Sequence, residues 1–287
     1  MNRLKITKKI NLNSLPKYSV WPKKLLSLKK LKINKTKKEI IREFNKEKWK
    51  KIYNVIIKKK KISILGAEKI LNNPNKIIPC YIGEQGFCLS KNGEINKYIL
   101  TLLKNRIKKY LKGSNCLVEL GAGFGSKIIQ LSKNLKKKNL QLIAGEYTSI
   151  GCKLIKIIAK YEKVNIKVKH CDFNNLKKIK IPKNSIIITS YSIHYIPKLK
   201  ENFIKIINSL KPKIVIHFEP CYELYDSQTI HGLMCRHYVE TNDYNKNLFS
   251  ILNREYKKNK IHLKIKKNIF GHNPLLPISI LEWKKKY

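Results

Sequence analysis

The decisive stretch of this sequence reads Val118-Glu119-Leu120-Gly121-Ala122-Gly123-Phe124-Gly125. Its apolar beginning predicts a buried strand over residues 117–120. The three glycines then allow a tight turn and let a ligand lie against the backbone, because no Cβ stands in the way. Residues 127–135 have a helical pattern, and the free N–H groups at a helix start favour a polar or anionic ligand group. The stretch therefore predicts a strand, a ligand-binding turn and a helix.

Two acidic positions follow the next strands of the pattern. Glu146 ends the strand expected at 140–147, 21 residues after Gly125, where a carboxylate can accept both hydroxyls of a ribose. Asp172 and Phe173 end the strand expected at 166–173, where the acid can accept an adenine amino group while the ring lies against the base. These positions indicate a nucleoside-binding edge of a sheet.

The same residues could also form a dinucleotide site or a plain turn with solvated acids. A dinucleotide dehydrogenase needs GxGxxG, but Ser126 occupies the place of its third glycine and Gly125 comes one residue earlier, so NAD is disfavoured. The glycines can also form a plain turn, and Glu146 and Asp172 can be solvated acids at strand ends. The agreement of all these positions in register favours a nucleoside ligand.

Strand and helix patterns alternate through the second half of the chain. Further strands are expected at 185–193 and 214–219, helices at 150–161 and 199–210, and a long helical stretch between 226 and 256. The last two strands, 261–269 and 278–283, have a short connection and must therefore be antiparallel. The predicted fold class is α/β, with a seven-stranded mostly parallel sheet, an antiparallel C-terminal strand and helices on both faces.

This combination of motifs resembles the class I S-adenosylmethionine-dependent methyltransferases. The resemblance covers about residues 93–287 and is strongest at the cofactor end. It implies S-adenosyl-L-methionine as cofactor, with the glycine loop on the methionine part, Glu146 on the ribose and Asp172 on the adenine. The cofactor-binding residues implied in this way are Glu119, Gly121, Gly123, Gly125, Glu146, Asp172, Phe173 and Ser190.

The substrate end of the site offers three candidate catalytic residues. His194 and Tyr191, after the fourth strand, can orient or deprotonate a nucleophile, since a neutral imidazole works near pH 7. Glu219, after the fifth strand, can bind an amine or take a proton. His194 can equally be a satisfied core histidine. The Asn/Asp-Pro-Pro-aromatic signature of amide-methylating relatives is absent, which weakens a nucleobase amino-methyltransferase interpretation.

One wall of the acceptor pocket is expected between residues 226 and 244. This stretch is rich in polar and aromatic groups, namely His231, Arg236, His237, Tyr238, Glu240, Asn242 and Asp243. A solvated helix face would have a similar composition. No acid and histidine grouping has the spacing of metal ligands, so no metal is expected.

The first part of the chain is predicted to be a separate unit. Residues 1–92 are interpreted as a basic N-terminal extension and helical cap, and residues 93–287 as the methyltransferase domain. An apolar stripe of helical spacing between Ile40 and Ile56 predicts a helix that docks on this domain. Residues 62–90 are expected to be loop-rich, and a helix is expected at 93–111.

The net charge of +45 raises the question of nucleic acid. Only 5 of the 63 basic residues are Arg, which nucleic-acid readers usually prefer, and the Lys, Ile, Asn and Tyr enrichment fits A/T-rich codons. Residues 1–61 nevertheless hold 22 Lys and Arg against 3 Asp and Glu. We therefore prefer a small-molecule acceptor, with a role in specialised metabolite biosynthesis. RNA (rRNA or tRNA) methylation through the basic N-terminal region is the alternative, and a binding protein that has lost transfer is the third.

The composition also limits the setting of the protein. No apolar run approaches the roughly 18 residues of a membrane span, and no signal peptide is visible at the N-terminus, so we expect a soluble, cytoplasmic protein without a membrane partner. The 7 cysteines are scattered and contain no CxxC pair, which indicates reduced thiols. The sequence leaves the oligomeric state open.

Overall fold

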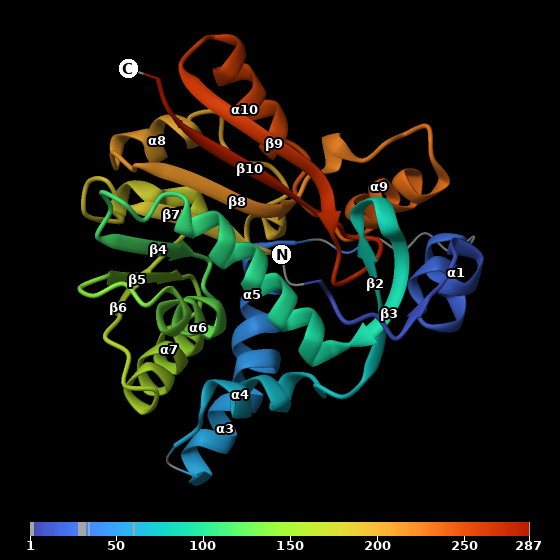
Figure 1. The fold of residues 1–287 in the computed structure, drawn as a ribbon, viewed down its shortest axis with the longest axis horizontal. Coiled ribbons are helices and arrows are strands. Elements are labelled where there is room, and N and C mark those ends of the chain that lie inside the picture. Colours follow the sequence, from blue (N-terminus) through green and yellow to red (C-terminus); the bar gives the residue numbers. More distant parts are fainter. Residues whose placement is uncertain (1–2, 28–32, 34, 60, 287) are drawn as a thin grey trace.

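The core of the protein is a seven-stranded sheet with the order β6-β5-β4-β7-β8-β10-β9 (Figure 1). The computed structural model describes residues 3–27, 33, 35–59 and 61–286. The strands are β4 (Cys116–Leu120), β5 (Gln141–Glu146), β6 (Lys167–His170), β7 (Ile186–Ser190), β8 (Ile214–Pro220), β9 (Ile261–Phe270) and β10 (Ile278–Lys285). The strands from β4 to β8 are parallel, and β10 is antiparallel to both of its neighbours. The predicted fold class is confirmed.

Burial across the sheet explains why these segments are strands. Every residue of β4, β7 and β8 is buried, since helices cover both faces of the sheet centre. The edge strands β6 and β9 are largely exposed and rich in lysine, which opposes pairing with another chain. Leu117 packs into the core on one face, and its neighbour Val118 into the core on the other.

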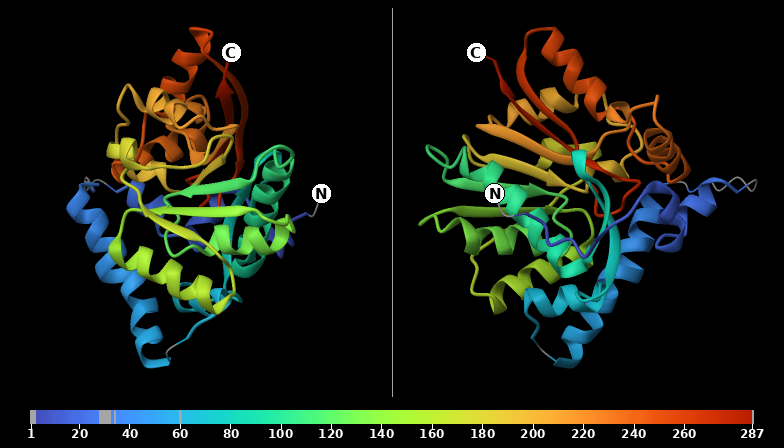
Figure 2. Two further views of the ribbon diagram at one scale, coloured as in Figure 1. Left: turned by 90° about the vertical axis from the view of Figure 1, so that its left-hand side faces the viewer. Right: turned by 45° about the vertical axis from the view of Figure 1, so that its right-hand side comes forward.

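Helices cover both faces of the sheet (Figure 2). Those on one face include α5 (Asn92–Lys108), α6 (Ser126–Leu135) and α7 (Ser149–Tyr161), and those on the other include α8 (Phe203–Ser209) and α10 (Leu248–Lys257). The helical stretch expected between 226 and 256 is divided into α9 (Ile230–Thr241) and α10. The break occurs because Asp243 adopts a left-handed conformation and the Asn245 side chain accepts from the N–H groups of Asn247 and Leu248.

The N-terminal region contains more regular structure than the sequence indicates. The expected docking helix is present as α2 (Lys37–Ile41), a π-helical segment (Arg42–Lys48) and α3 (Trp49–Lys59). Residues 62–90, expected to be loop-rich, instead form α4 (Ile64–Leu71), β2 (Ile77–Ile82) and β3 (Gly86–Lys91). Pro79 is tolerated because β2 is the edge of a small sheet of order β1-β3-β2, in which β1 is Lys8–Lys9. That prediction was wrong because proline and glycine mark edges and hairpin turns as well as loops.

The first residues of the described chain are not a loose tail. A short helix η1 (Leu12–Lys17) buries Leu15 completely, and α1 (Trp21–Leu25) packs against α9 at the right of Figure 1. The rings of Trp21 and Tyr238 meet edge to face, with centroids 4.6 Å apart. None of the helices in the described ranges combines the length and the apolar character needed to cross a bilayer.

Candidate active site

A cavity of about 440 Å³, which we call the glycine cavity, opens at the carboxyl ends of the parallel strands. This is the edge at which ligands bind in open α/β sheets, and the volume lies in the usual range of ligand pockets. Its wall includes most of the residues expected to bind a cofactor, namely Gly121, Gly123, Glu146, Asp172, Phe173 and Ser190.

The glycine turn after β4 requires glycine for steric reasons. Gly121, Gly123 and Gly125 have φ angles of +74°, +60° and +84°. A Cβ on Gly121 would lie 2.4 Å from the Cβ of Ser192, and a Cβ on Gly123 would lie 3.1 Å from the Trp49 ring. Side chains are therefore excluded both by the backbone conformation and by the close approach of neighbouring residues.

Glu146, the last residue of β5, connects the glycine turn to this strand through hydrogen bonds. Its Oε2 accepts a hydrogen bond from the Gly123 N–H at 2.8 Å, and its Oε1 accepts from Thr148 N and Oγ1 at 2.9 and 2.6 Å. Burial raises the pKa of this carboxyl group, and the hydrogen bonds oppose the rise. The predicted ribose acid thus lies on the cavity wall in a fixed position.

Glu119 and Gly125 are absent from the wall of the glycine cavity. Glu119 is fully buried beneath the turn, where its Oε2 accepts from Ile128 N at 3.1 Å at the start of α6. Burial raises the pKa of Glu119 to about 7, against the charge of Lys127. Gly125 begins α6, and a Cβ there would meet Ile155. Both residues shape the turn in this structure, and their role in cofactor binding stays a prediction.

The remaining predicted cofactor residues surround the other end of the cavity. Asp172 accepts from Asn174 N at 2.8 Å and pairs with Lys37 Nζ at 3.0 Å. Burial alone would raise the pKa of Asp172, but the bond to Lys37 holds it below its usual value. The Phe173 ring lies next to Gly121. The Ser190 hydroxyl is buried and has no hydrogen-bond partner among the described residues.

A second cavity of about 980 Å³, which we call the aromatic cavity, adjoins the first. Its aromatic wall comes from segments far apart in the chain and includes Tyr18, Trp21, Phe44, Trp49, Phe124, Tyr191, Tyr195, Tyr238 and Tyr244. The two cavities share Lys35, Phe44, Trp49, Phe124, Ser126, Lys127, Tyr191 and Tyr195. A ligand in one cavity therefore lies next to a ligand in the other.

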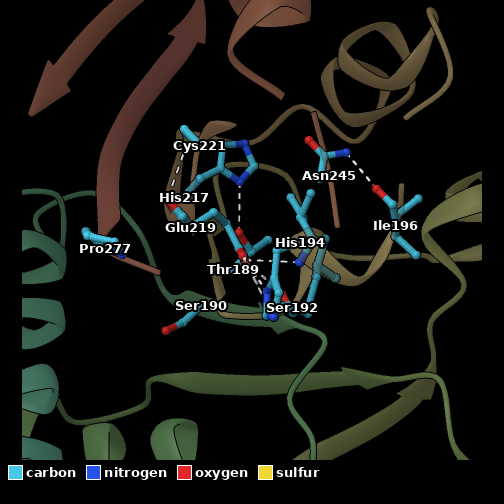
Figure 3. A network of polar contacts seen from close by, with 12 residues as sticks. Thr189, Ser190, Ser192, His194, Ile196, His217, Glu219, Cys221, Asn245 and Pro277 are labelled. Carbon is cyan, nitrogen blue, oxygen red and sulfur yellow. Dashed lines mark hydrogen bonds and ion pairs between the residues drawn. The ribbon is translucent and has the colours of Figure 1, made fainter. Parts of the chain in front are cut away.

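His194 lines the aromatic cavity, and its ring lies next to the Glu219 carboxylate (Figure 3). Its Nδ1 lies 3.5 Å from Glu219 Oε2, which is longer than an ordinary hydrogen bond, and has no other partner in the described part of the chain. Burial lowers the pKa of His194, and the Glu219 carboxylate only partly opposes this shift. The imidazole is therefore neutral at pH 7.

Glu219 itself lines neither cavity. Its carboxylate accepts from Ser192 N at 3.0 Å, Ser192 Oγ at 3.1 Å and Ile193 N at 3.2 Å (Figure 3). Burial would raise its pKa, but His194 and these N–H groups hold the pKa below its usual value. This enclosed carboxylate positions the loop and His194 through these bonds, and a direct catalytic role for Glu219 stays a prediction.

Tyr191 lies where the two cavities meet. It has a φ of +51°, unusual for a residue with a side chain, and its hydroxyl accepts from His272 N at 3.3 Å. Burial raises the pKa of Tyr191 well above its ordinary value. The phenol therefore remains protonated and can act as a hydrogen-bond donor, not as a base.

Neither a protein-family model nor a curated protein sequence matches the chain. Similar folds occur among solved structures. An O-methyltransferase from Bacillus cereus is 10% identical, with a TM-score of 0.45, over 66% of this chain and 81% of that one. Magnesium protoporphyrin IX methyltransferase from Synechocystis is 11% identical, with a TM-score of 0.46, over 68% of this chain and 86% of that one. A tRNA (uracil-54, C5)-methyltransferase from Pyrococcus abyssi is 13% identical, with a TM-score of 0.41, over 69% of this chain and 39% of that one.

The strand order and the antiparallel β10 decide the fold. The chain has the class I methyltransferase fold. The activity has to be argued from the site.

Within this methyltransferase fold, the aromatic cavity is what sequence reasoning mostly missed. Of the wall expected between 226 and 244, Tyr238 and Asn242 line the cavity, whereas His231, Arg236, His237, Glu240 and Asp243 do not. The unexpected wall residues include Lys35 and four residues of the β9–β10 connection, His272, Asn273, Pro274 and Leu276. The place of the β9–β10 connection could have been predicted from the sequence. A strand antiparallel to β8 must begin at the edge of the sheet where β8 ends, so the residues before it lie at the site.

Proposed function

We propose that the protein is an S-adenosyl-L-methionine-dependent methyltransferase that acts on a small-molecule acceptor. The observation that carries the proposal is the junction of two cavities at the carboxyl edge of the sheet, one built on the glycine turn and one on aromatic side chains. Methyl transfer needs this arrangement, because donor and acceptor must be held within contact distance. A tailoring step on a specialised metabolite fits an acceptor of this kind.

The residues of the glycine cavity fit the cofactor. The proposal assigns Glu146 to the ribose and Asp172 with Phe173 to the adenine, and it is supported by the place of all three in the wall of this cavity. The unpartnered Ser190 hydroxyl offers a buried polar group to a ligand. Gly121 and Gly123 line this cavity, so the methionine part can lie against their backbone. We assign these residues to S-adenosyl-L-methionine.

The aromatic cavity supports a small acceptor over RNA. Its walls combine side chains from α1, the π-helical segment, α9 and the β9–β10 connection, so they surround a ligand from several sides. Its volume is that of a small-molecule pocket. We propose that residues 1–92 act as the cap of this pocket, because Trp21, Lys35, Phe44 and Trp49 all belong to them.

The chain's own residues can assist transfer to a hydroxyl acceptor. When bound, S-adenosyl-L-methionine supplies an electrophilic methyl group. The aromatic walls exclude water and orient the acceptor toward the junction. With Nδ1 carrying its proton toward Glu219, His194 presents the lone pair of Nε2, which can take the proton that the acceptor oxygen loses as it gains the methyl group. Tyr191 donates a hydrogen bond nearby.

Calorimetry and methyl transfer test the two parts of this proposal. We expect S-adenosylhomocysteine to bind and NAD to give no heat of binding. Protein supplied with methyl-labelled S-adenosyl-L-methionine is then mixed with either a small-molecule extract or total RNA. Label in the small-molecule fraction is the expected result. Label in RNA, lost when salt is raised from 50 to 200 mM as phosphate contacts require, would replace the small acceptor by RNA.

A further inference from the structure

The carboxylates that face the aromatic cavity are already used within the protein. Glu43 accepts from Lys35 Nζ and Lys48 Nζ, each at 2.7 Å. Glu68 accepts from Gln130 Nε2 at 2.8 Å and from the Ser126 hydroxyl. A cationic acceptor would therefore have to displace one of these bonds and face several lysines. The cavity is unsuited to an amine.

Lys127 lines both cavities and forms no ion pair within the described part of the chain. Its Nζ reaches only the Ser190 carbonyl oxygen, at 3.5 Å. Among the described residues no carboxylate forms an ion pair with it, although the buried Glu119 acts on it through space. It is the second residue of α6, where the N–H groups of the first turn add to the positive potential.

Trp49 places an unused donor at the same junction. Its side chain is only 8% exposed, and its Nε1 has no hydrogen-bond partner among the residues that the structure describes. An indole N–H can only donate, so it requires an acceptor atom from a ligand. The ring also packs against Phe44 and Phe124, with centroids 5.3 and 5.2 Å away, which fixes the direction of the N–H.

We infer that the acceptor is an aromatic molecule with a carboxylate group, and that Lys127 and Trp49 bind this carboxylate at the junction. A charge-assisted bond to Lys127 and a donated bond from Trp49 satisfy both groups, while Phe44 and Tyr195 offer ring faces to the aromatic part. The inference rests on the proposed function. The other possible source of a carboxylate is the methionine end of the cofactor, which the experiment separates.

The test uses protein saturated with S-adenosylhomocysteine and three ring-matched probes, 4-hydroxybenzoate, 4-hydroxybenzamide and 4-hydroxybenzylamine. Calorimetry gives each dissociation constant. We expect the benzoate to bind at least tenfold more tightly than the amide, and the benzylamine to bind most weakly. Lys127→Met should remove the difference between benzoate and amide, and Trp49→Phe should weaken benzoate binding severalfold while the ring contacts remain.

Controls distinguish the possible failures. Lys51→Met removes a charge from the same cavity away from the junction and should change benzoate affinity by less than twofold. Lys127→Met should leave S-adenosylhomocysteine affinity within threefold; a larger loss assigns Lys127 to the cofactor carboxylate and overturns the inference. Benzoate that binds no better than the amide, including the case in which neither binds, also overturns it. Failure of wild type to bind S-adenosylhomocysteine defeats the proposed function instead.

Discussion

The two cavities of this protein are built in opposite ways. The glycine cavity is formed by short continuous segments at strand ends, and its shape depends on backbone conformation and on the hydrogen bonds of Glu146. The aromatic cavity is formed by single side chains that tertiary packing gathers from residues 18 to 276. A backbone-built site can be read from local sequence, whereas a packing-built site depends on contacts between remote segments. Changes in the two cavities should therefore have different consequences.

The packing behind the aromatic cavity supports this contrast. Leu15, Leu25, Tyr238 and Leu276 belong to one buried cluster that joins η1, α1, α9 and the β9–β10 connection. This cluster is separate from the two cores on the faces of the sheet. Side chains of the aromatic cavity therefore contribute to stability as well as to the cavity wall.

Gly121→Val should have the largest effect and would break the backbone-built cavity. The new Cβ would lie 2.4 Å from Ser192 Cβ and would force a side chain into a φ of +74°. We expect S-adenosylhomocysteine affinity to fall more than a hundredfold in calorimetry. The matched control is Gly86→Ala, which has a φ of +76° but no atom within 4 Å of the new Cβ, so it should bind normally. Normal binding by Gly121→Val would contradict the assignment of the turn.

Glu146→Gln should have the next largest effect. The amide cannot accept from all three donors, Gly123 N, Thr148 N and Thr148 Oγ1, because one of its heavy atoms is itself a donor. Charge-assisted hydrogen bonds contribute about 1.5–3 kcal/mol each, so the dissociation constant should rise more than tenfold. Glu162→Gln is the control, since Glu162 also accepts from a backbone N–H and a lysine but lies outside both cavities. Equal effects of the two variants would refute a special role for Glu146.

Trp21→Ala tests the aromatic cavity, whose wall includes this side chain. Removal of the indole takes away its contact with Tyr238 and part of the aromatic cavity wall. We expect a loss of about 2 kcal/mol in the free energy of unfolding, below the range for fully buried tryptophan because this side chain is half-buried. Affinity for S-adenosylhomocysteine should stay within twofold. Denaturant unfolding and calorimetry measure the two quantities, and a parallel loss of both would show that the cavities are not independent.

The last prediction concerns stability in acid. Burial lowers the pKa of His217 and of His272 to about 4 and also lowers the pKa of His194. The unfolded chain binds these protons near pH 6.5, so stability is fully present above that pH and declines between about 6.5 and 4. In His217→Gln, urea titrations over this range should give a shallower decline than in wild type. An unchanged slope would mean that His217 is not held neutral.

The same contrast explains what the sequence could predict. The strands from β4 to β8 and the closing pair follow from apolar runs and turn residues, and the glycine turn with Glu146 and Asp172 follows from local spacing. The pairing of β1 with β3 and the break between α9 and α10 were missed, because they depend on remote partners or on one left-handed residue. Lys35 and His272 were missed for the same reason, since no local pattern says that they face one cavity.

The place of His272, Asn273, Pro274 and Leu276 in the wall of the aromatic cavity has a consequence for folding during protein synthesis. β10 lies between β8 and β9, so the connection takes its position only after residues near 285 have left the ribosome. At about 5–20 residues per second, that follows the emergence of β7 by roughly 5–20 s. The nascent chain can thus form the glycine turn early, whereas the aromatic cavity lacks this part of its wall until β10 has emerged.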